Sequence, residues 1–504
     1  MNKQKQYNEV ITHSTMKKPV VQVSKLNLKY QQREVLKEVN WQINNGENWL
    51  LDGESGSGKT SLVKIIASQE NENIKLNFNE NSGIFPKALY IENWYQFKNL
   101  EGVANFYYQQ RYTSLQAKDT HTVNAELINY GETYQLDLAK VEEILQALGF
   151  SNLRNSTLIE LSSGEHKKLQ LVKALWLKPQ LLILDQPYTG LDALSRQNLN
   201  QLLDQISGEG VQYILISNEK ELPLTINRFA TIANGILSES DQRNEGSIES
   251  EKLKKAIPYF LSEAPAYTST NLIRLTNVNV SYGDKQVLKN INWTVNAGEK
   301  WLLQGHNGSG KSTLLSLVNG DHPQAYANDI YLFGNKRGSG ESIWDIKKHI
   351  GLISPELHWY FDQSATVWQS IASGFADSVG LFSTLVEGKR KMVNDLIHFF
   401  DLDAYQNELL TVLPLGKQRL VLLARTIIKN PQLLILDEPC QGLDQQQIKH
   451  FNQLVDELCS NGMTVIYVAH NDDQLPNCLT NRLVLNKGEV VENIEVYKTQ
   501  KELA

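Results

Sequence analysis

The octapeptide GESGSGKT at residues 53–60 recurs as GHNGSGKS at residues 305–312. Each copy follows a short apolar run, which ends at Leu51 or Leu303, and each precedes an amphipathic stretch. A strand, a glycine-rich turn and a helix in this order predict a phosphate-binding loop, whereas the octapeptide alone would be a weak signal. The sequence therefore predicts two nucleotide-binding loops.

The whole chain is a tandem repeat. Lys311 lies 252 residues after Lys59, and the same offset relates the other landmarks of the two halves. The pairs are Tyr30 and Tyr282, Gly164 and Gly416, Asp185 and Asp437, Asp192 and Asp444, and Asn218 and His470. A repeat this long is a whole domain. We expect a polar N-terminal tail at 1–20, a first nucleotide-binding domain at 21–238, a linker at 239–270 and a second nucleotide-binding domain at 271–504.

The composition predicts a cytoplasmic globular protein. A chain of 504 residues with 41% hydrophobic residues is too long for a single core. No apolar stretch reaches the roughly 18–20 uncharged residues that cross a bilayer, and the polar N-terminus has no secretory signal. Three cysteines without a CxxC spacing indicate reduced thiols. The net charge of −7 gives no general reason to expect nucleic acid.

Two continuous apolar runs, Leu181 to Asp185 and Leu433 to Asp437, predict the core of each half. Such runs are typical of strands that are buried on both faces of a mostly parallel sheet. The polar segments from about Phe97 to Ile159 and from Trp344 to Val412 favour helix. We interpret them as a helical subdomain inserted into each half.

The phosphate loops carry the predicted ATP and Mg²⁺ ligands. Glycines let backbone N–H groups converge on a phosphate, Lys59 and Lys311 add charge, and a helix N-terminus favours the same anion. Thr60, Asp185, Ser312 and Asp437 are the predicted Mg²⁺ ligands, because hydroxyl and carboxylate oxygens suit this cation. The predicted ATP ligands are Gly53, Ser55, Gly56, Gly58, Lys59, Thr60 and Ser61 in the first loop, and Gly305, Asn307, Gly308, Gly310, Lys311, Ser312 and Thr313 in the second.

The two halves differ at the residues that would activate water. Glu438 follows Asp437, and a carboxylate there can accept a proton from water, whereas the amide of its counterpart Gln186 cannot. His470 follows another apolar run and can hydrogen-bond the γ-phosphate; Asn218 is its counterpart. An isolated histidine at a strand end is more often structural, but the constant offset places His470 within the predicted site.

Taken together, these motifs make the chain resemble an ATP-binding cassette (ABC) protein with two nucleotide-binding domains in tandem, most like the molybdate-transport-type tandem ATP-binding proteins. The resemblance implies an α/β fold in which each P-loop NTPase domain has a mostly parallel core sheet, an antiparallel β subdomain and the inserted helical subdomain. It implies that Tyr30 and Tyr282 stack on adenine, and that Leu161 to Glu165 is the family's signature motif. It also implies that the domains face each other head to tail, so that each ATP contacts one phosphate loop and the opposite signature.

With this head-to-tail arrangement, the residue differences between the two halves predict one competent and one degenerate site. The second signature reads LPLGK at 413–417, and Pro414 lacks both the hydroxyl and the N–H that Ser162 offers. The degenerate site combines Pro414 with the first phosphate loop, Gln186 and Asn218. The predicted catalytic residues all belong to the competent site; they are Glu438, His470, Lys311, Ser162 and Gly164.

Three functions remain open at this stage. We favour an ATPase subunit that powers a separate membrane permease, located in the cytoplasm or at the inner face of the cell membrane. The alternative is a soluble ATP-driven switch that acts on a ribosome or nucleic acid, and the third is a regulator that hardly hydrolyses ATP. The family's glutamine is missing after Tyr90-Ile91 and after Leu352-Ile353, which weakens the case for standard coupling to a permease. The aromatic stretch 105–112 could stack on bases, but we favour its packing within the helical subdomain.

Overall fold

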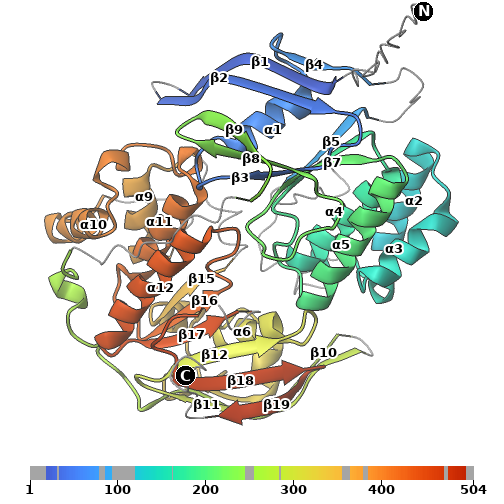
Figure 1. Cartoon of the computed structure of the whole chain (residues 1–504). Helices are drawn as coiled ribbons and strands as arrows, with labels where there is room; N and C mark the ends of the chain where they lie inside the picture. Colours follow the sequence, from blue (N-terminus) through green and yellow to red (C-terminus); the bar gives the residue numbers. More distant parts are fainter. Residues whose placement is uncertain are drawn as a thin grey trace, which may run out of the picture.

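The computed structural model of the chain (Figure 1) consists of two halves with the same architecture. It describes residues 19–30, 33–78, 86–92, 120–161, 163–243, 255–282, 285–354, 364–377, 384–469 and 475–494. Among these residues, no helix is both long enough and apolar enough to cross a membrane.

Within its described residues, the first half contains a six-stranded sheet, a three-stranded sheet and five α-helices. The order of the larger sheet is β5 (Ala88–Ile91), β6 (Leu181–Asp185), β7 (Gln212–Ile216), β3 (Trp49–Asp52), β8 (Arg228–Ala233) and β9 (Ile236–Ser240), and only the pairing of β8 with β9 is antiparallel. The antiparallel smaller sheet is β2 (Arg33–Asn44), β1 (Pro19–Tyr30) and β4 (Ile74–Leu76). The helices are α1 (Lys59–Ser68), α2 (Val123–Tyr134), α3 (Val141–Ala147), α4 (Ser163–Leu177) and α5 (Ala193–Gly208).

The second half repeats this plan. Its larger sheet has the order β15 (Ile350–Ile353), β16 (Leu433–Asp437), β17 (Thr464–Val468), β12 (Lys300–Gly305), β18 (Asn481–Asn486) and β19 (Glu489–Ile494), again with one antiparallel edge pair. The antiparallel smaller sheet is β11 (Lys285–Asn296), β10 (Asn271–Tyr282), β13 (Asp329–Leu332) and β14 (Asn335–Lys336). The helices are α6 (Lys311–Val318), α7 (Ile343–Lys347), α9 (Val367–Ala372), α10 (Glu387–Phe399), α11 (Leu415–Ile427) and α12 (Gln445–Ser460).

The central strands are buried on both faces, as their continuous apolar runs predict. In β6, Leu182 and Leu184 pack into one hydrophobic cluster with the helices α3 to α5. Leu181 and Ile183 point to the opposite face and pack into a second cluster with the smaller sheet and α1. Since successive side chains of a strand alternate between faces, a run that is apolar throughout fills both cores. The predicted α/β fold class is confirmed.

The predicted start of the helical segment in the second half is wrong. Trp344 lies in α7, but Ile350–Ile353 then forms β15 and pairs in parallel with β16, so this stretch belongs to the core sheet. A four-residue apolar run gains its strand conformation from the neighbouring strand, and sequence periodicity cannot identify it. Residues 97–119 of the corresponding segment in the first half lie outside the described residues.

The later part of the expected linker packs on the second half. Lys255 forms an ion pair with Asp401, with 2.5 Å between Nζ and Oδ1. The side chain of Leu261 is buried in the core that contains α11 and α12. Tyr267 Oη donates a hydrogen bond of 2.5 Å to the carbonyl oxygen of Gly462. Residues 255–270 are therefore fixed to the domain that follows them.

The two halves face each other in opposite orientations. In Figure 1 the blue strands of the first half lie above the orange helices α9 and α11 of the second. The green helices α4 and α5 of the first half lie above α6 and β10 of the second. Each half therefore presents its helices to the phosphate-loop side of the other.

Candidate nucleotide-binding sites

Each phosphate loop leads directly into a helix. α1 begins at Lys59 after Gly58, and α6 begins at Lys311 after Gly310. The two glycines have φ angles of 108° and 105°, in the left-handed region that side chains disfavour. The free N–H groups of the first helical turn then point toward the loop, where they attract an anion.

The two loop lysines fold back over their own loops. Lys59 Nζ lies 2.7 Å from the carbonyl oxygen of Glu54, and Lys311 Nζ lies 2.7 Å from that of Gly305. Burial lowers the pKa of both lysines, while neighbouring carboxylates, first of all Asp52 and Glu438, oppose this shift. A bound phosphate can take the place of these carbonyl contacts with a stronger, charge-assisted one.

The first half also brings a suitable pair of Mg²⁺ ligands together. Thr60 Oγ1 donates a hydrogen bond of 2.6 Å to Oδ2 of Asp185, whose side chain is buried at the end of β6. A hydroxyl and a carboxylate at this separation fit the oxygen shell that Mg²⁺ prefers. Tyr90 Oη donates to the same Asp185 oxygen over 3.1 Å. This tyrosine has Leu352 as its counterpart beside β16, so the two halves differ next to the aspartates that end β6 and β16.

Glu438 and Gln186 occupy equivalent backbone positions. Their φ angles are 46° and 47°, and their N–H groups donate to Val468 and Ile216 over 3.2 Å and 2.9 Å. Glu438 Oε2 accepts a hydrogen bond of 3.2 Å from Gln441 Nε2. The chemical difference between the halves at this position is therefore a carboxylate against an amide on the same backbone.

The first signature meets the second phosphate loop. A Cβ atom on Gly164 would lie 3.3 Å from Asn307 Nδ2 and 2.4 Å from the carbonyl oxygen of Gly190. Asn307 Nδ2 donates a hydrogen bond of 2.8 Å to that same carbonyl. Glycine is therefore required at 164 for the start of α4 to lie this close to the Gly190 carbonyl and to Asn307. The structure brings Gly164 together with the phosphate loop of Lys311.

The second signature lies against the first phosphate loop. A Cβ atom on Gly56 would lie 2.8 Å from Cγ of Pro414. Close by, Asp444 Oδ2 accepts a hydrogen bond of 3.1 Å from the N–H of Ser55, and Asn218 Nδ2 donates to the carbonyl of Leu443 over 3.4 Å. The proline that replaces the signature serine thus packs on the loop that contains Lys59.

Some predicted residues lie outside the part of the chain that the structure describes. These are Ser162, His470, the side chain of Tyr30 and the aromatic stretch 105–112. Tyr282 is described, and its side chain is 41% exposed at the end of β10.

The sequence interpretation missed the role of the aspartates that cap α5 and α12. Asp192 and Asp444 accept the N–H groups of Ser195 and Gln447, and so begin these helices. Asp444 also contacts the opposite phosphate loop, whereas Asp192 lies 3.5 Å from Lys168 Nζ. An aspartate three residues before a helical amide is an ordinary cap, so the repeat offset was the only signal for a second role.

A buried cation in each signature helix was also missed. Lys167 Nζ donates a hydrogen bond of 2.5 Å to the carbonyl oxygen of Glu92, and burial lowers the pKa of Lys167 to about 7. Its counterpart Arg419 is likewise completely buried. The signal was a cation at the same repeat offset in both signature helices.

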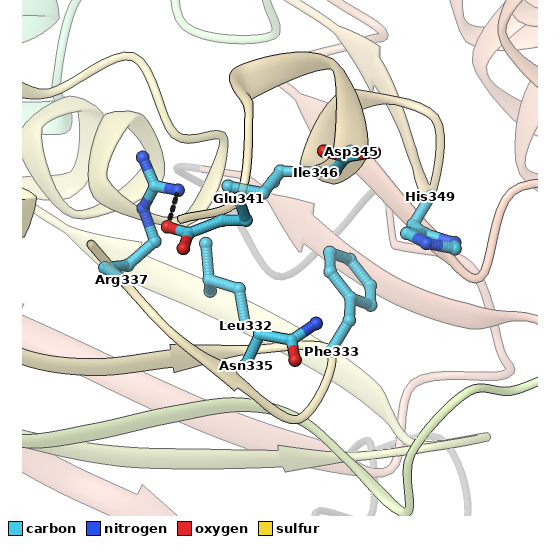
Figure 2. A pocket seen from close by; sticks show the side chains of 8 residues that line it. All are labelled: Leu332, Phe333, Asn335, Arg337, Glu341, Asp345, Ile346 and His349. Carbon is cyan, nitrogen blue, oxygen red and sulfur yellow. Dashed lines mark hydrogen bonds and ion pairs between the residues drawn. The ribbon is translucent and has the colours of Figure 1, made fainter. Parts of the chain in front are cut away.

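A separate hollow lies on the smaller sheet of the second half (Figure 2). Arg337 forms an ion pair of 2.6 Å with Glu341 beside it, and the guanidinium also lies 4.9 Å from the ring centre of Tyr326. Phe333 and His349 close the other side. The charge of Arg337 is balanced within this hollow, and its lining contains none of the predicted ATP ligands.

Known proteins resemble this chain in both halves. The family described as ABC transporter matches residues 36–189 and 288–441. The ABC transporter ATP-binding protein ModF of Escherichia coli (strain K12) is 35% identical over 465 residues, which cover 88% of this chain and 91% of that protein. An uncharacterized ABC transporter ATP-binding protein of Schizosaccharomyces pombe is 30% identical over 91% of this chain and 96% of its own. The solved structure of cbiO1 from Clostridium perfringens, part of the ABC transporter complex cbiONQ, is 26% identical with a TM-score of 0.41, over 47% of this chain and 91% of its own.

Proposed function

Because the chain belongs to the ABC transporter family, we propose that it binds two ATP molecules between its halves and hydrolyses mainly one of them. The hydrolysed ATP is held by the phosphate loop of Lys311 together with the signature of the first half. The domain limits given above, 21–238 and 271–504, are part of this proposal. The observation that carries it is the close approach of Gly164 to Asn307 in the phosphate loop of Lys311, whose pKa the neighbouring carboxylate of Glu438 raises against the effect of burial.

The residues of this site have separate roles in the proposal. Lys311 and the N–H groups of α6 bind the phosphates, and Ser312 and Asp437 hold Mg²⁺, which neutralises charge on the phosphates when bound. Glu438 accepts the proton of the attacking water, and His470 orients that water. Ser162 and Gly164 complete the site from the opposite half. Tyr282 stacks on the adenine ring, as Tyr30 does in the first half.

The site of Lys59 binds ATP but contributes little hydrolysis. Thr60 and Asp185 have the right oxygen atoms for Mg²⁺, which supports binding. Gln186 has no carboxylate to accept a proton, and Pro414 offers no hydroxyl. Both changes affect the chemical step more than the affinity, because the phosphate loop itself is intact.

A matched pair of variants tests the assignment. Glu438→Gln should reduce ATP turnover on the order of 10²–10⁴-fold, the usual contribution of a general base. Gln186→Glu is the reverse exchange in the other half. It should restore little ATP hydrolysis to the site of Lys59, because Asn218 and Pro414 remain there. Turnover that survives Glu438→Gln but is lost in a Lys59→Ala variant would assign hydrolysis to the other site.

We further propose that the chain is the ATP-binding subunit of a transporter with a separate permease, bound at the inner face of the cell membrane. The family assignment supports this role. The second candidate is an ATP-driven switch on a ribosome or nucleic acid, and one observation favours it: β5 and β15 are followed by Glu92 and Ser354, where the resemblance leads us to expect glutamine.

Capture with the slow Glu438→Gln protein distinguishes the two roles. With ATP and Mg²⁺ this variant should hold the closed state and retain its partner. Recovery of an integral membrane protein supports the permease role, whereas recovery of ribosomal subunits or nucleic acid supports the switch. The same capture without ATP is the control.

A further inference from the structure

A buried histidine contacts the exposed tyrosine of the second half. His322 Nε2 lies 2.7 Å from Tyr282 Oη, and the N–H of Gln324 donates to His322 Nδ1 over 3.1 Å. Burial lowers the pKa of His322 to about 4, so the ring is neutral at pH 7. Because Nδ1 accepts the hydrogen bond from the Gln324 N–H, the single ring proton of the neutral imidazole is on Nε2, and Nε2–H donates to the tyrosine oxygen.

His322 is itself fixed to the helix that follows the phosphate loop. Its side chain is 1% exposed, and its N–H donates to the carbonyl oxygen of Ser316 in α6 over 3.2 Å. Gln324 also binds the backbone of Ser281: its Nε2 donates to the carbonyl over 2.7 Å, and its Oε1 accepts the N–H over 3.2 Å. The residues around the turn Pro323–Ala327 therefore hold the hydroxyl of Tyr282 and the backbone of the residue before it.

The connection that carries His322 has no histidine in its counterpart in the first half. In the first half α1 ends at Ser68 and β4 begins at Ile74, and the residues between them include no histidine. In the second half the connection from Val318 to Asp329 is longer, and the added residues carry the histidine and the glutamine. The half with the extra contact is the one that contains Glu438.

We propose that His322 is a positioning residue, which holds Tyr282 in the orientation that stacks on the adenine of the ATP bound by the second phosphate loop. This inference rests on the proposed function, in which Tyr282 contacts the base. A ring that is already oriented loses less conformational freedom when the nucleotide binds. The hydrolytic site therefore prefers nucleotides with a base over phosphate chains alone.

Two conservative variants remove the contact from either side. His322→Asn retains a side-chain oxygen that can cap the turn by accepting the N–H of Gln324, but it is too short to reach the tyrosine. Tyr282→Phe retains the ring and removes only the hydroxyl. Each should raise KM for ATP about 3- to 10-fold, as expected for one immobilised side chain, with kcat unchanged. The double variant should be no worse than either single variant.

A second measurement separates positioning from general damage to the fold. ADP and inorganic tripolyphosphate are compared as competitive inhibitors of each variant. Inhibition by ADP should weaken by the same factor as KM, whereas inhibition by tripolyphosphate, which has no base, should not change. Tyr326→Phe, which removes a hydroxyl from the same turn, is the control and should leave both inhibitors unaffected.

The outcomes distinguish this inference from the proposed function. If Tyr282→Ala leaves KM for ATP unchanged, the tyrosine does not contact the base and that part of the proposed function fails. If Tyr282→Ala raises KM but Tyr282→Phe and His322→Asn do not, the positioning role of His322 is wrong. Additive effects in the double variant, or an equal loss for tripolyphosphate, also overturn it. Tyr282→Phe alters only a half-exposed side chain and decides the question if the His322→Asn protein does not fold.

Discussion

The burial of Lys167 makes the free energy of unfolding depend on pH. Its pKa is lowered to about 7 by burial, whereas in the unfolded chain it has its ordinary value near 10.5. Between pH 7 and 10.5 the unfolded chain therefore binds a proton that the folded chain lacks. Linkage makes the free energy of unfolding rise with pH across this window, by at most about 1.4 kcal/mol per pH unit.

This sign gives a direct prediction for Lys167→Met. The variant should be more stable than the wild type at pH 7, and this advantage should shrink as the pH approaches 10. Urea denaturation at several pH values measures the difference. Lys178→Met, which changes a lysine whose side chain is 40% exposed at the end of the same helix, is the control and should show no such trend. A stability difference for Lys167→Met that is independent of pH contradicts the prediction.

At the scale of residues, the sequence could predict chemistry but not contacts. Glu438 and Gln186 were distinguished because their side chains differ in type at a constant repeat offset. The burial of Lys167 and the contact of Asp444 with Ser55 could not be predicted, because they depend on which segments meet in space. A lysine in a helix is exposed in most proteins, and composition gives no reason to expect otherwise.

At the scale of elements, strong local sequence patterns were sufficient to predict the bounds of helices and strands, whereas weak patterns were not. β6 and β16 have the bounds that their apolar runs predict. Each run has four apolar residues followed by an aspartate, and a short apolar run of this kind between turn signals fits a buried strand. The first residues of α1 and α6 are set by the glycine-rich turns that precede them. The sequence pattern placed β15 within a predicted helical segment. Its strand conformation depends on pairing with β16, which lies far along the sequence and which a local pattern does not reveal.

The start of α4 is the element on which the interface most depends. We predict that Gly164→Ala reduces ATP turnover on the order of 10²-fold, because the added Cβ would lie 2.4 Å from the Gly190 carbonyl and displace the acceptor of Asn307. Gly208→Ala is a matched control near the end of α5, where a Cβ would meet no atom within 4 Å. The control should retain full turnover and gain up to about 1 kcal/mol of stability from helix propensity. Equal activity of the two variants contradicts the prediction.

At the scale of the whole molecule, the repeat predicted two similar domains, and the opposed orientation was implied by the family resemblance. Neither composition nor periodicity contains information on how two domains face each other. The contacts of Pro414 with Gly56 and of Asn307 with Gly190 supply that information. Because of these contacts, a change in the signature residues of one half affects the site that contains the phosphate loop of the other half.

The packing of residues 255–270 on the second half has a kinetic consequence. Separate cassettes must find each other by diffusion, so that their pairing is second order and weakens on dilution. Here both halves belong to one chain, and closure is a unimolecular step with an effective concentration in the millimolar range for a short linker. We predict that the ATP turnover per molecule is the same at nanomolar and micromolar protein concentration. Turnover that rises with protein concentration would mean that the working unit contains more than one copy of the chain.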